Sequence, residues 1–550
     1  MHPLRLHLIL FCIIGAYTTL GIRLYNIQIR HGDLYSAQAE SQYKLAGFFE
    51  PHRGLITITD KKGTLLPIAE NRPYRVVMAE TKVIKDKDAA IENLAPILGI
   101  ESANLRKLLD GKRAYPVLMK DPTDEQVTKI AEAAIPGIQI DQQEKRSYPL
   151  GSLASQIVGF TGPGKDDDAV RGRYGIEKEF DGELAGTPGS MDEVTSLMPA
   201  QGMDIALTID RPVQAEAEKI LADLVRDKQA IAGSAIVMDP MSGKVLAMAS
   251  VPDFDPNAYP DYPVAAFTNP AVQARYEPGS VFKVLTAAIG LDTGKIAPDT
   301  TFYDSGKLVF EDGKTVRNWD LKAHGTVTMT NVIEESLNTG AAFMESRIGH
   351  GPFYDYLLKF GLDKPTGIRL PGEVAGNLKN IKTHTADIDF AAASFGQGVA
   401  VTPIQLITAV AALGNGGNLV KPYVTASERP ETVRRVLGRD AATKATAMME
   451  SAVVKAKVAH IPNYRIAGKT GTAQAVDFVR GGYSKDVINT YVGFGPVSAP
   501  RFIILIKLDK PKGAPLAGTT VVPAFRKLAE FVIDYYGIPP DNLPKEPANG

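Results

Sequence analysis

The chain begins with an apolar segment that is long enough to cross a membrane. From Leu6 to Ile22 the sequence "LHLILFCIIGAYTTLGI" contains no Lys, Arg, Asp or Glu, and Arg5 and Arg23 flank it. About 17 such residues are close to the shortest length of a transmembrane helix. A cleaved signal peptide is the alternative, but no clear small-residue cleavage site follows the run. We therefore expect residues 1–30 to form a short tail and an uncleaved single-pass anchor.

Length and composition limit what the remainder can be. A chain of 550 residues is too long for one typical domain, so two or three are expected. The net charge of −1 shows no basic excess, so we expect no nucleic-acid partner. Cys12 is the only cysteine, and the 8 histidines show no metal-binding spacing. We therefore expect no disulfide within the chain, no metal and no cofactor.

Residues 31–200 are expected to form an extended module without catalytic residues. The stretch "HRGLITITDKKGTLLPIA" alternates like two strands around a turn at Lys62 and Gly63. The stretches "DAAIENLAPILGI" and "DEQVTKIAEAAI" have helical periodicity. No nucleophile or metal-ligand cluster occurs here, which indicates a structural or partner-binding role.

Residues 201–537 are expected to form an α+β domain. Strands are predicted at "DIALTID" and as a hairpin in "GSAIVMDPMSGKVLAMASV". A largely helical stretch follows, and strands return at "YRIAGKTGTAQ", "TYVGFGPV" and "RFIILIKLD" before a last helix, "VVPAFRKLAEFVIDYYG". This order predicts an antiparallel sheet with helices on its faces. Residues 538–550 are expected to be a polar tail.

A serine and a lysine stand at the start of an apolar helical run in "RYEPGSVFKVLTAAIG". Ser280 follows the loop residues Pro278 and Gly279, and Lys283 is the only charge in the run after it. Residues three apart share a helix face, so Lys283 is placed to touch the Ser280 hydroxyl. Alone, Ser280 could be a helix cap and Lys283 could reach solvent. A second copy of the pattern, Ser41 to Lys44, shows how weak it is by itself.

Two further motifs change this interpretation. The first is "EESLNTG", with Ser336 and Asn338, and the second is "AGKTGTA", which holds Lys469, Thr470, Gly471 and Thr472. Alone, the first could cap a helix and the second could be a turn. A phosphate-binding loop is excluded, because Asn463 stands where that motif needs glycine. The ordered set Ser-x-x-Lys, Ser-x-Asn, Lys-Thr-Gly is the signature of penicillin-binding proteins and serine β-lactamases.

Each motif residue has a chemical role in that signature. Lys283 can take the proton of Ser280 if burial lowers its pKa. Ser336 would relay a proton to the leaving group, Asn338 would orient Lys283 and the substrate, and Lys469 would add positive field at Ser336. Gly471 lets a strand edge approach a ligand closely. Thr470 and Thr472 would hold a substrate carboxylate, and the backbone N–H groups of Ser280 and Thr472 would form the oxyanion hole.

Nearly the whole chain resembles class B, monofunctional penicillin-binding proteins. The matching stretches are "HRGLITITDKKG", "RSYPLGSLASQIVGFTG", "GIEKEFDGELAGTPG", "MDPMSGKVLAMASVPDFDPN", "FGQGVAVTPIQL" and "YVGFGP". The resemblance implies a cytoplasmic tail, one transmembrane helix, a pedestal domain for dimerisation or partner binding, and a transpeptidase domain. The stretches "SLNTGAAFMESRIG" and "KFGLDKPTGIRLPGE" favour the division type. Lys61 departs from the acid–arginine pair usual in "ITITDKKG".

The family resemblance also implies a reaction, a location and partners. The reaction is D,D-transpeptidation of peptidoglycan stem peptides, with β-lactams as covalent inhibitors. The location is the outer side of the cytoplasmic membrane. The partners are a glycosyltransferase of the shape, elongation, division and sporulation class and other division proteins. Two alternatives stay open: an acyl-serine hydrolase, such as a β-lactamase, carboxypeptidase or β-lactam sensor, and a catalytically inactive scaffold.

Overall fold

The computed structural model describes residues 15, 17–21, 23, 25, 51–111, 113, 115–163, 170–187, 190–191, 196–197, 200–311, 313–383, 386–476 and 482–541. Most of the predicted anchor and most of the polar tail lie outside these residues. Among the residues that are described, no helix combines the length and apolar character needed to cross a membrane. The chain divides into a small unit of residues 1–54 with 182–203 and a large unit of residues 55–181 with 204–550. The domain boundaries expected from the sequence stay a prediction.

Backbone pairing organises the described part of the small unit. Strands β7 (Ser190–Met191) and β8 (Ser196–Leu197) form an antiparallel pair. The N–H of Gly202 donates to the carbonyl of His52, and the N–H of Gly54 donates to the carbonyl of Leu184. Two distant segments of the chain therefore lie side by side within this unit.

The large unit begins with a mixed sheet. Strand order is β3 (Val117–Lys120), β2 (Leu66–Ala79), β1 (Ile56–Thr59), β9 (Ile205–Asp210), and β4 (Ile138–Ser147) also pairs with β2. The pair β1–β2 is antiparallel, as the alternating sequence predicted, whereas β1–β9 is parallel. The long antiparallel ladder between β2 and β4 runs from Glu70 opposite Ser147 to Ala79 opposite Ile138.

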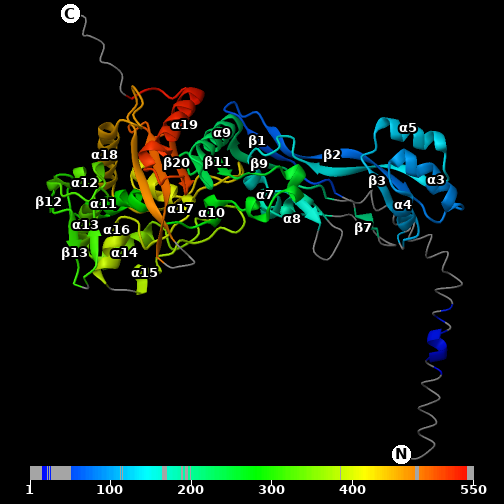
Figure 1. Cartoon of the computed structure of the whole chain (residues 1–550), viewed down its shortest axis with the longest axis horizontal. Helices are drawn as coiled ribbons and strands as arrows, with labels where there is room; N and C mark the ends of the chain where they lie inside the picture. Colours follow the sequence, from blue (N-terminus) through cyan, green and yellow to red (C-terminus); the bar gives the residue numbers. More distant parts are fainter. Residues whose placement is uncertain are drawn as a thin grey trace, which may run out of the picture. The chain divides into compact units, whose positions relative to one another are not determined.

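Three helices enclose a small core against this sheet, and Figure 1 shows them gathered about β3. They are α3 (Lys87–Leu98), α4 (Ser102–Leu109) and α5 (Asp124–Ala133), which confirms both predicted helices. Asp86 caps the start of α3 and Gly99, at φ 67°, ends it. A capping box between Thr123 and Gln126 starts α5. The core residues are Val77, Leu94, Leu98, Leu105, Leu109 and Leu118.

The second sheet is five-stranded and antiparallel throughout. Its order is β11 (Val245–Val251), β10 (Ala232–Met238), β20 (Phe502–Asp509), β19 (Tyr483–Gly495), β18 (Ala467–Val476). Helices α9 (Arg211–Asp227) and α19 (Val521–Tyr536) bury their apolar sides with β10, β11 and β20 in one core. The predicted α+β domain with a helix-flanked antiparallel sheet is confirmed, and β18 is an edge strand.

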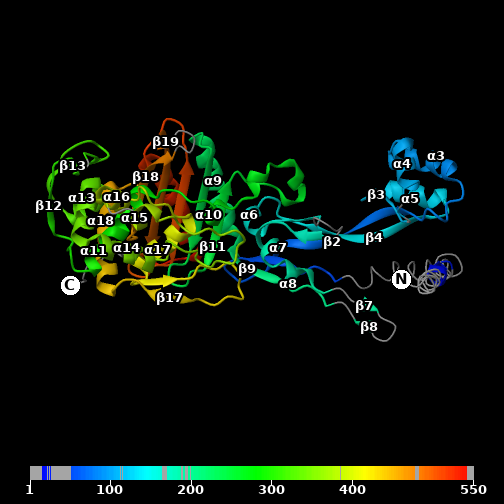
Figure 2. The same ribbon diagram turned by 90° about the horizontal axis from the view of Figure 1, so that it is seen from below.

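A helical region lies next to the β18 side of this sheet in both Figures 1 and 2. Helix α11 (Lys283–Asp292) is buried along most of its length, between α17 (Pro403–Gly414) and α18 (Arg439–Ala456). The other longer elements of the region are α12 (Met329–Glu334), α13 (Asn338–Ile348), α14 (His350–Lys359), α16 (Asp387–Ser394), and the strand pairs β12 (Thr301–Asp304) with β15 (Gly325–Thr328) and β13 (Lys307–Val309) with β14 (Thr315–Arg317).

Short elements complete the large unit. They are α6 (Ser155–Val158), β5 (Thr161–Pro163), β6 (Val170–Gly172), α7 (Gly175–Glu179), α10 (Pro270–Gln273), α15 (Lys379–Thr383), β16 (Asn418–Val420) and β17 (Thr432–Arg435). Helix α8 (Asp181–Ala185) spans the residue at which the two units divide. The residue that departs from the family pattern, Lys61, donates through its backbone N–H to the Tyr535 hydroxyl, 2.8 Å away, and through its ammonium to the Tyr535 carbonyl, 2.7 Å away.

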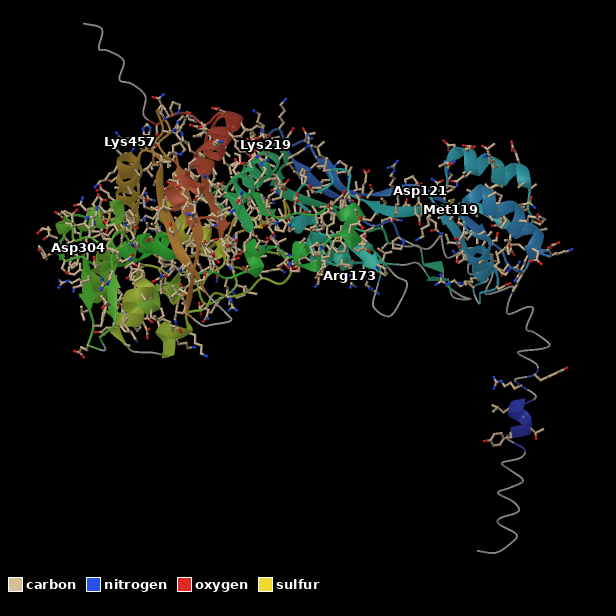
Figure 3. The ribbon with its side chains drawn as sticks, viewed as in Figure 1. Met119, Asp121, Arg173, Lys219, Asp304 and Lys457 are labelled. Carbon is tan, nitrogen blue, oxygen red and sulfur yellow. The ribbon has the colours of Figure 1, made fainter. Side chains whose placement is uncertain are left out.

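A buried ion pair joins the end of β4 to α7. The guanidinium of Arg146 donates from Nε to the Glu177 carboxylate at 2.7 Å, and both side chains are at most 4% exposed. The neighbouring Lys145 also forms an ion pair, with Asp121 at 2.6 Å, but its side chain is 47% exposed. Asp121 is labelled in Figure 3. Adjacent cations on one strand therefore form one buried and one exposed pair.

We expect Arg146→Ala to lower the free energy of unfolding by about 3–5 kcal/mol, because Glu177 would keep a buried charge without its partner. Lys145→Ala is the matched control, and its effect should stay within about 1 kcal/mol. Chemical denaturation of the purified variants measures both. Equal effects of the two substitutions would contradict a structural role for the buried pair.

Candidate active site

Ser280 lies in a tight turn that leads into a buried helix. Residues Gly279–Phe282 form a 3-10 turn, and α11 continues directly from it at Lys283. Gly279 adopts φ +57°, which suits glycine, and its N–H donates to the carbonyl of Gly396 at 3.2 Å. The turn thus leaves Ser280 at the partly exposed start of an otherwise buried helix.

Lys283 is fully buried and reaches Ser336. Its ammonium donates to the backbone carbonyl of Ser336 and, at 3.3 Å, to the Ser336 hydroxyl. Burial first, and the charge of Lys469 second, hold the pKa of Lys283 well below its usual value. In the described structure the hydrogen bonds of the Lys283 ammonium go to Ser336, and none joins it to Ser280.

Lys469 comes from β18 and meets the same hydroxyl. Its ammonium donates to Ser336 Oγ at 2.9 Å and to the Thr470 carbonyl at 3.2 Å. Burial lowers the pKa of Lys469 to about 7. Two buried ammonium groups against one neutral hydroxyl repel each other, so the site favours at least one uncharged lysine near neutral pH. An uncharged lysine is a base.

Ser336 occupies the turn between α12 and α13. Its φ of +57° is in the left-handed region, which is unusual for a residue with a side chain. This conformation, together with the two lysine contacts, aims the hydroxyl into the space between α11 and β18. The contacts agree with the predicted roles of Ser336 and Lys469 as partners.

Asn338 is placed differently from its sequence-based interpretation. It is the first residue of α13, and its side-chain amide donates to the carbonyl of Arg317 at 2.8 Å. In the described structure it makes no hydrogen bond to Lys283. Its expected role in orienting Lys283 and the substrate stays a prediction.

Gly471 allows β18 to pass against the Ser280 turn. A Cβ atom on Gly471 would lie 2.5 Å from the carbonyl oxygen of Pro278 and 3.0 Å from the Val281 side chain. The sequence analysis expected glycine here so that a ligand could approach the strand. In the structure, the Ser280 turn already lies too close to this strand for a larger residue. Thr472 accepts from the N–H of Ala517 at 3.1 Å, so its hydroxyl is held at the same strand edge.

The sequence analysis assigned no role to two residues that hold parts of the site in place, Gly396 and Asp304. Gly396, in the quoted stretch "FGQG", has φ +80°, and a Cβ there would lie 2.3 Å from the Gly279 carbonyl. Asp304 is completely buried and accepts hydrogen bonds from Asn318 and Thr339, which fixes the first turn of α13 (Asp304 is labelled in Figure 3). The paired glycines were a sequence signal for Gly396, whereas nothing local distinguished Asp304 from a surface acid.

Comparisons with known proteins agree with this geometry. A model of the penicillin-binding protein transpeptidase domain matches residues 233–530, and a model of the penicillin-binding protein dimerisation domain matches residues 49–197. The chain belongs to the penicillin-binding protein transpeptidase family. The sequence-based identification of a class B, division-type penicillin-binding protein with transpeptidase activity is confirmed.

Relatives match over nearly their full length. The chain is 28% identical to peptidoglycan D,D-transpeptidase FtsI of Escherichia coli, with 98% of this chain and 93% of the relative covered. It is 29% identical to stage V sporulation protein D of Bacillus subtilis, with 97% and 86% covered. The crystal structure of penicillin-binding protein 3 from Mycobacterium tuberculosis with aztreonam matches with a TM-score of 0.68 and 27% identity, covering 89% and 97%.

We expect Gly471→Ala to slow the reaction of this penicillin-binding protein with labelled penicillin by about 10²-fold, because the added methyl group must push β18 away from the Ser280 turn. The control is Gly351→Ala on α14, where a Cβ would meet nothing within 4 Å. Circular dichroism should show both variants folded. A folded Gly471→Ala variant that reacts at the wild-type rate would show that this close approach does not matter for acylation.

Proposed function

We propose that this penicillin-binding protein cross-links peptidoglycan stem peptides through an ester on Ser280. The observation that carries the proposal is the convergence of Lys283 and Lys469 on the hydroxyl of Ser336 at the edge of β18. The relatives named peptidoglycan D,D-transpeptidase and the β-lactam complex of a similar structure support the same conclusion.

In the first half-reaction, Ser280 Oγ attacks the carbonyl carbon of the penultimate D-Ala and its proton passes to neutral Lys283. The carbonyl oxygen becomes negative, and the backbone N–H groups of Ser280 and Thr472 would stabilise it. The bond to the terminal D-Ala then breaks, and its nitrogen receives a proton through Ser336. The short contacts of Ser336 with both lysines support this relay.

In the second half-reaction, an amine of a neighbouring stem peptide attacks the ester carbonyl and loses a proton to the site. Ser280 leaves with a proton and the cross-link is complete. The edge strand β18 offers free backbone groups along which an extended peptide can lie. Thr470 and Thr472 would bind the terminal carboxylate of the donor or the equivalent carboxylate of a β-lactam.

Intact-protein mass spectrometry after a short pulse of penicillin tests the proposal. We expect the mass of the drug to appear on the peptide that contains Ser280 and to persist for many minutes after free drug is removed. Rapid return to the native mass while drug is consumed would favour a hydrolase. No adduct at any drug concentration would favour an inactive scaffold.

Three variants assign the roles within the same experiment. Ser280→Ala should form no adduct. Lys283→Arg should not react, because a guanidinium cannot act as a base, whereas Lys469→Arg keeps the positive charge and should react slowly. Wild-type acylation by Lys283→Arg would show that another group accepts the proton of Ser280.

We propose that residues beyond about 30 are exported while the N-terminal segment stays in the cytoplasmic membrane. The apolar run from Leu6 to Ile22 and a substrate outside that membrane support this topology. Reporter fusions after Gly32 and at the C-terminus should both give the exported signal. A cytoplasmic signal from the C-terminal fusion would contradict the topology and the peptidoglycan substrate together.

We further propose that the region matched by the dimerisation model serves as a pedestal for partner proteins, including a membrane-embedded glycosyltransferase of the shape, elongation, division and sporulation class. The separate core formed by α3, α4 and α5 supports a binding role that does not depend on catalysis. Co-purification of the two proteins in detergent should survive Ser280→Ala. Its loss in that variant would link the association to acylation instead.

A further inference from the structure

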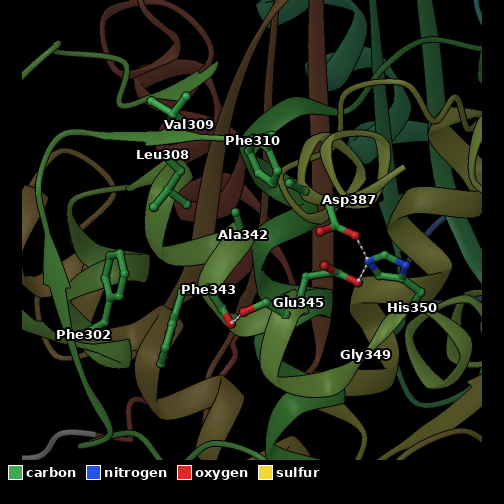
Figure 4. Close-up of a pocket in the computed structure, with 12 residues that line it drawn as sticks. Phe302, Leu308, Val309, Phe310, Ala342, Phe343, Glu345, Gly349, His350 and Asp387 are labelled. Atoms are coloured by element: carbon green, nitrogen blue, oxygen red, sulfur yellow. Dashed lines mark hydrogen bonds and ion pairs between the residues drawn. The ribbon is translucent and has the colours of Figure 1, made fainter. Parts of the chain in front are cut away.

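A cavity lies between the hairpin β13–β14 and helices α13, α14 and α16. Its volume is about 530 Å³, which is in the range of small-molecule sites. Figure 4 shows the side chains of Phe302, Phe310 and Phe343 on one side and those of Glu345 and Asp387 on the other. None of the three catalytic motifs contributes a lining residue, so this cavity is separate from the Ser280 site.

Glu345 is the unusual residue of this cavity. Its side chain is 3% exposed, and its Oε1 atom has no hydrogen-bond partner. The imidazole of His350 is the neighbouring basic group, and its Nε2 atom lies 3.8 Å from that oxygen (Figure 4). Burial first, and the charge of Asp387 second, raise the pKa of Glu345 to about 8. A carboxylate in this position lacks a cation at hydrogen-bonding distance.

Both acidic side chains of the cavity face the same imidazole. The Nε2 atom of His350 lies 3.8 Å from Glu345 and 3.6 Å from Asp387, so neither acid is within hydrogen-bonding distance of it. His350 is also held in place, since its ring stacks on Phe390 at 3.9 Å between centroids. It cannot move toward Glu345 without losing that stacking.

The opposite wall is apolar and aromatic. Phe302 and Phe343 stack with their ring centroids 4.8 Å apart, and Leu308 and Phe310 extend the same wall. Such a surface favours an apolar body over a hydrated ion. In the described part of the chain no group of acidic, histidine or cysteine side chains is arranged to hold a metal ion. An anion is disfavoured by the two carboxylates.

We propose that this cavity binds a small organic cation, in which one ammonium group pairs with Glu345 and Asp387 and an apolar or aromatic body lies against Phe302 and Phe343. The ammonium would supply the donor that Glu345 Oε1 lacks, and Glu345 would lose its proton on binding. The helix that carries Glu345 also begins with the motif residue Asn338, about 10 Å away along the helix axis. An occupant of the cavity therefore contacts the same rigid element as the catalytic site.

Ligand-observed ¹⁹F NMR with 4-fluorophenethylamine tests the proposal. This probe carries one ammonium group on an aromatic body, and 2-(4-fluorophenyl)ethanol is its uncharged counterpart. We expect the amine to bind wild type in a saturable manner and at least ten-fold more tightly than the alcohol. Glu345→Gln should weaken amine binding at least ten-fold and leave binding of the alcohol unchanged.

The Glu345→Gln variant keeps the shape of the side chain, and Glu345 lies outside the catalytic motifs. We expect labelled penicillin to acylate this variant at the wild-type rate when no amine is present. That result would show that the variant is folded. Wild-type protein that has first been acylated at Ser280 with penicillin should bind the amine as unacylated protein does. This result would show that the amine does not bind beside Ser280, where the amine of a stem peptide would react. Equal amine binding by wild type and Glu345→Gln, loss of binding on acylation, or no saturable binding would each overturn the proposal.

Discussion

The candidate active site is built around two buried ammonium groups that share one hydroxyl. Lys283 comes from α11, Lys469 from β18 and Ser336 from the turn between α12 and α13. These elements are far apart in the sequence, and the interaction forms only when the helical region and the sheet edge pack together. Because burial opposes both charges, the packing that completes the fold also creates a base in the site.

This packing depends on glycines as much as on residues with side chains. The turn at Ser280 is contacted by Gly471 from β18 on one side and by Gly396 on the other, and a methyl group at either position would collide with backbone. Gly279, between them, takes a left-handed conformation. Ser280, the proposed nucleophile, is therefore held by close backbone contacts, which keeps its position independent of flexible side chains.

The sequence predicted those parts of the molecule that depend on local pattern. The antiparallel sheet followed from the order of the predicted strands and helices, and the helices α3 and α5 followed from apolar periodicity. The motif set identified Ser336 and Lys469, which the structure brings together. For Lys283, the i, i+3 relation predicted an approach to the Ser280 hydroxyl, but it gave no sign of Ser336, which accepts hydrogen bonds from the Lys283 ammonium in the structure.

Other features could not be read from the sequence because they depend on long-range contacts. The parallel pairing of β1 with β9 joins strands about 150 residues apart, and no local signal selects it. The cavity at Glu345 also depends on contacts between segments that are distant in the sequence. Its helix looked like an ordinary part of the domain, and only the arrangement of α14 and α16 leaves its carboxyl group buried without a hydrogen bond at one oxygen.

The placement of the acids near the site bears on why an acyl-enzyme should wait for an amine. Glu334 and Glu335 precede Ser336, yet both form ion pairs with Lys455 of α18, and Glu334 also accepts from Ser451. Glu277, three residues before Ser280, accepts from the Gly398 N–H and the Tyr483 hydroxyl. Hydrolysis of the ester needs a carboxylate that can take a proton from water. Since these three carboxylates are engaged elsewhere, their arrangement favours transfer to an amine, which brings its own nucleophilic nitrogen to the ester.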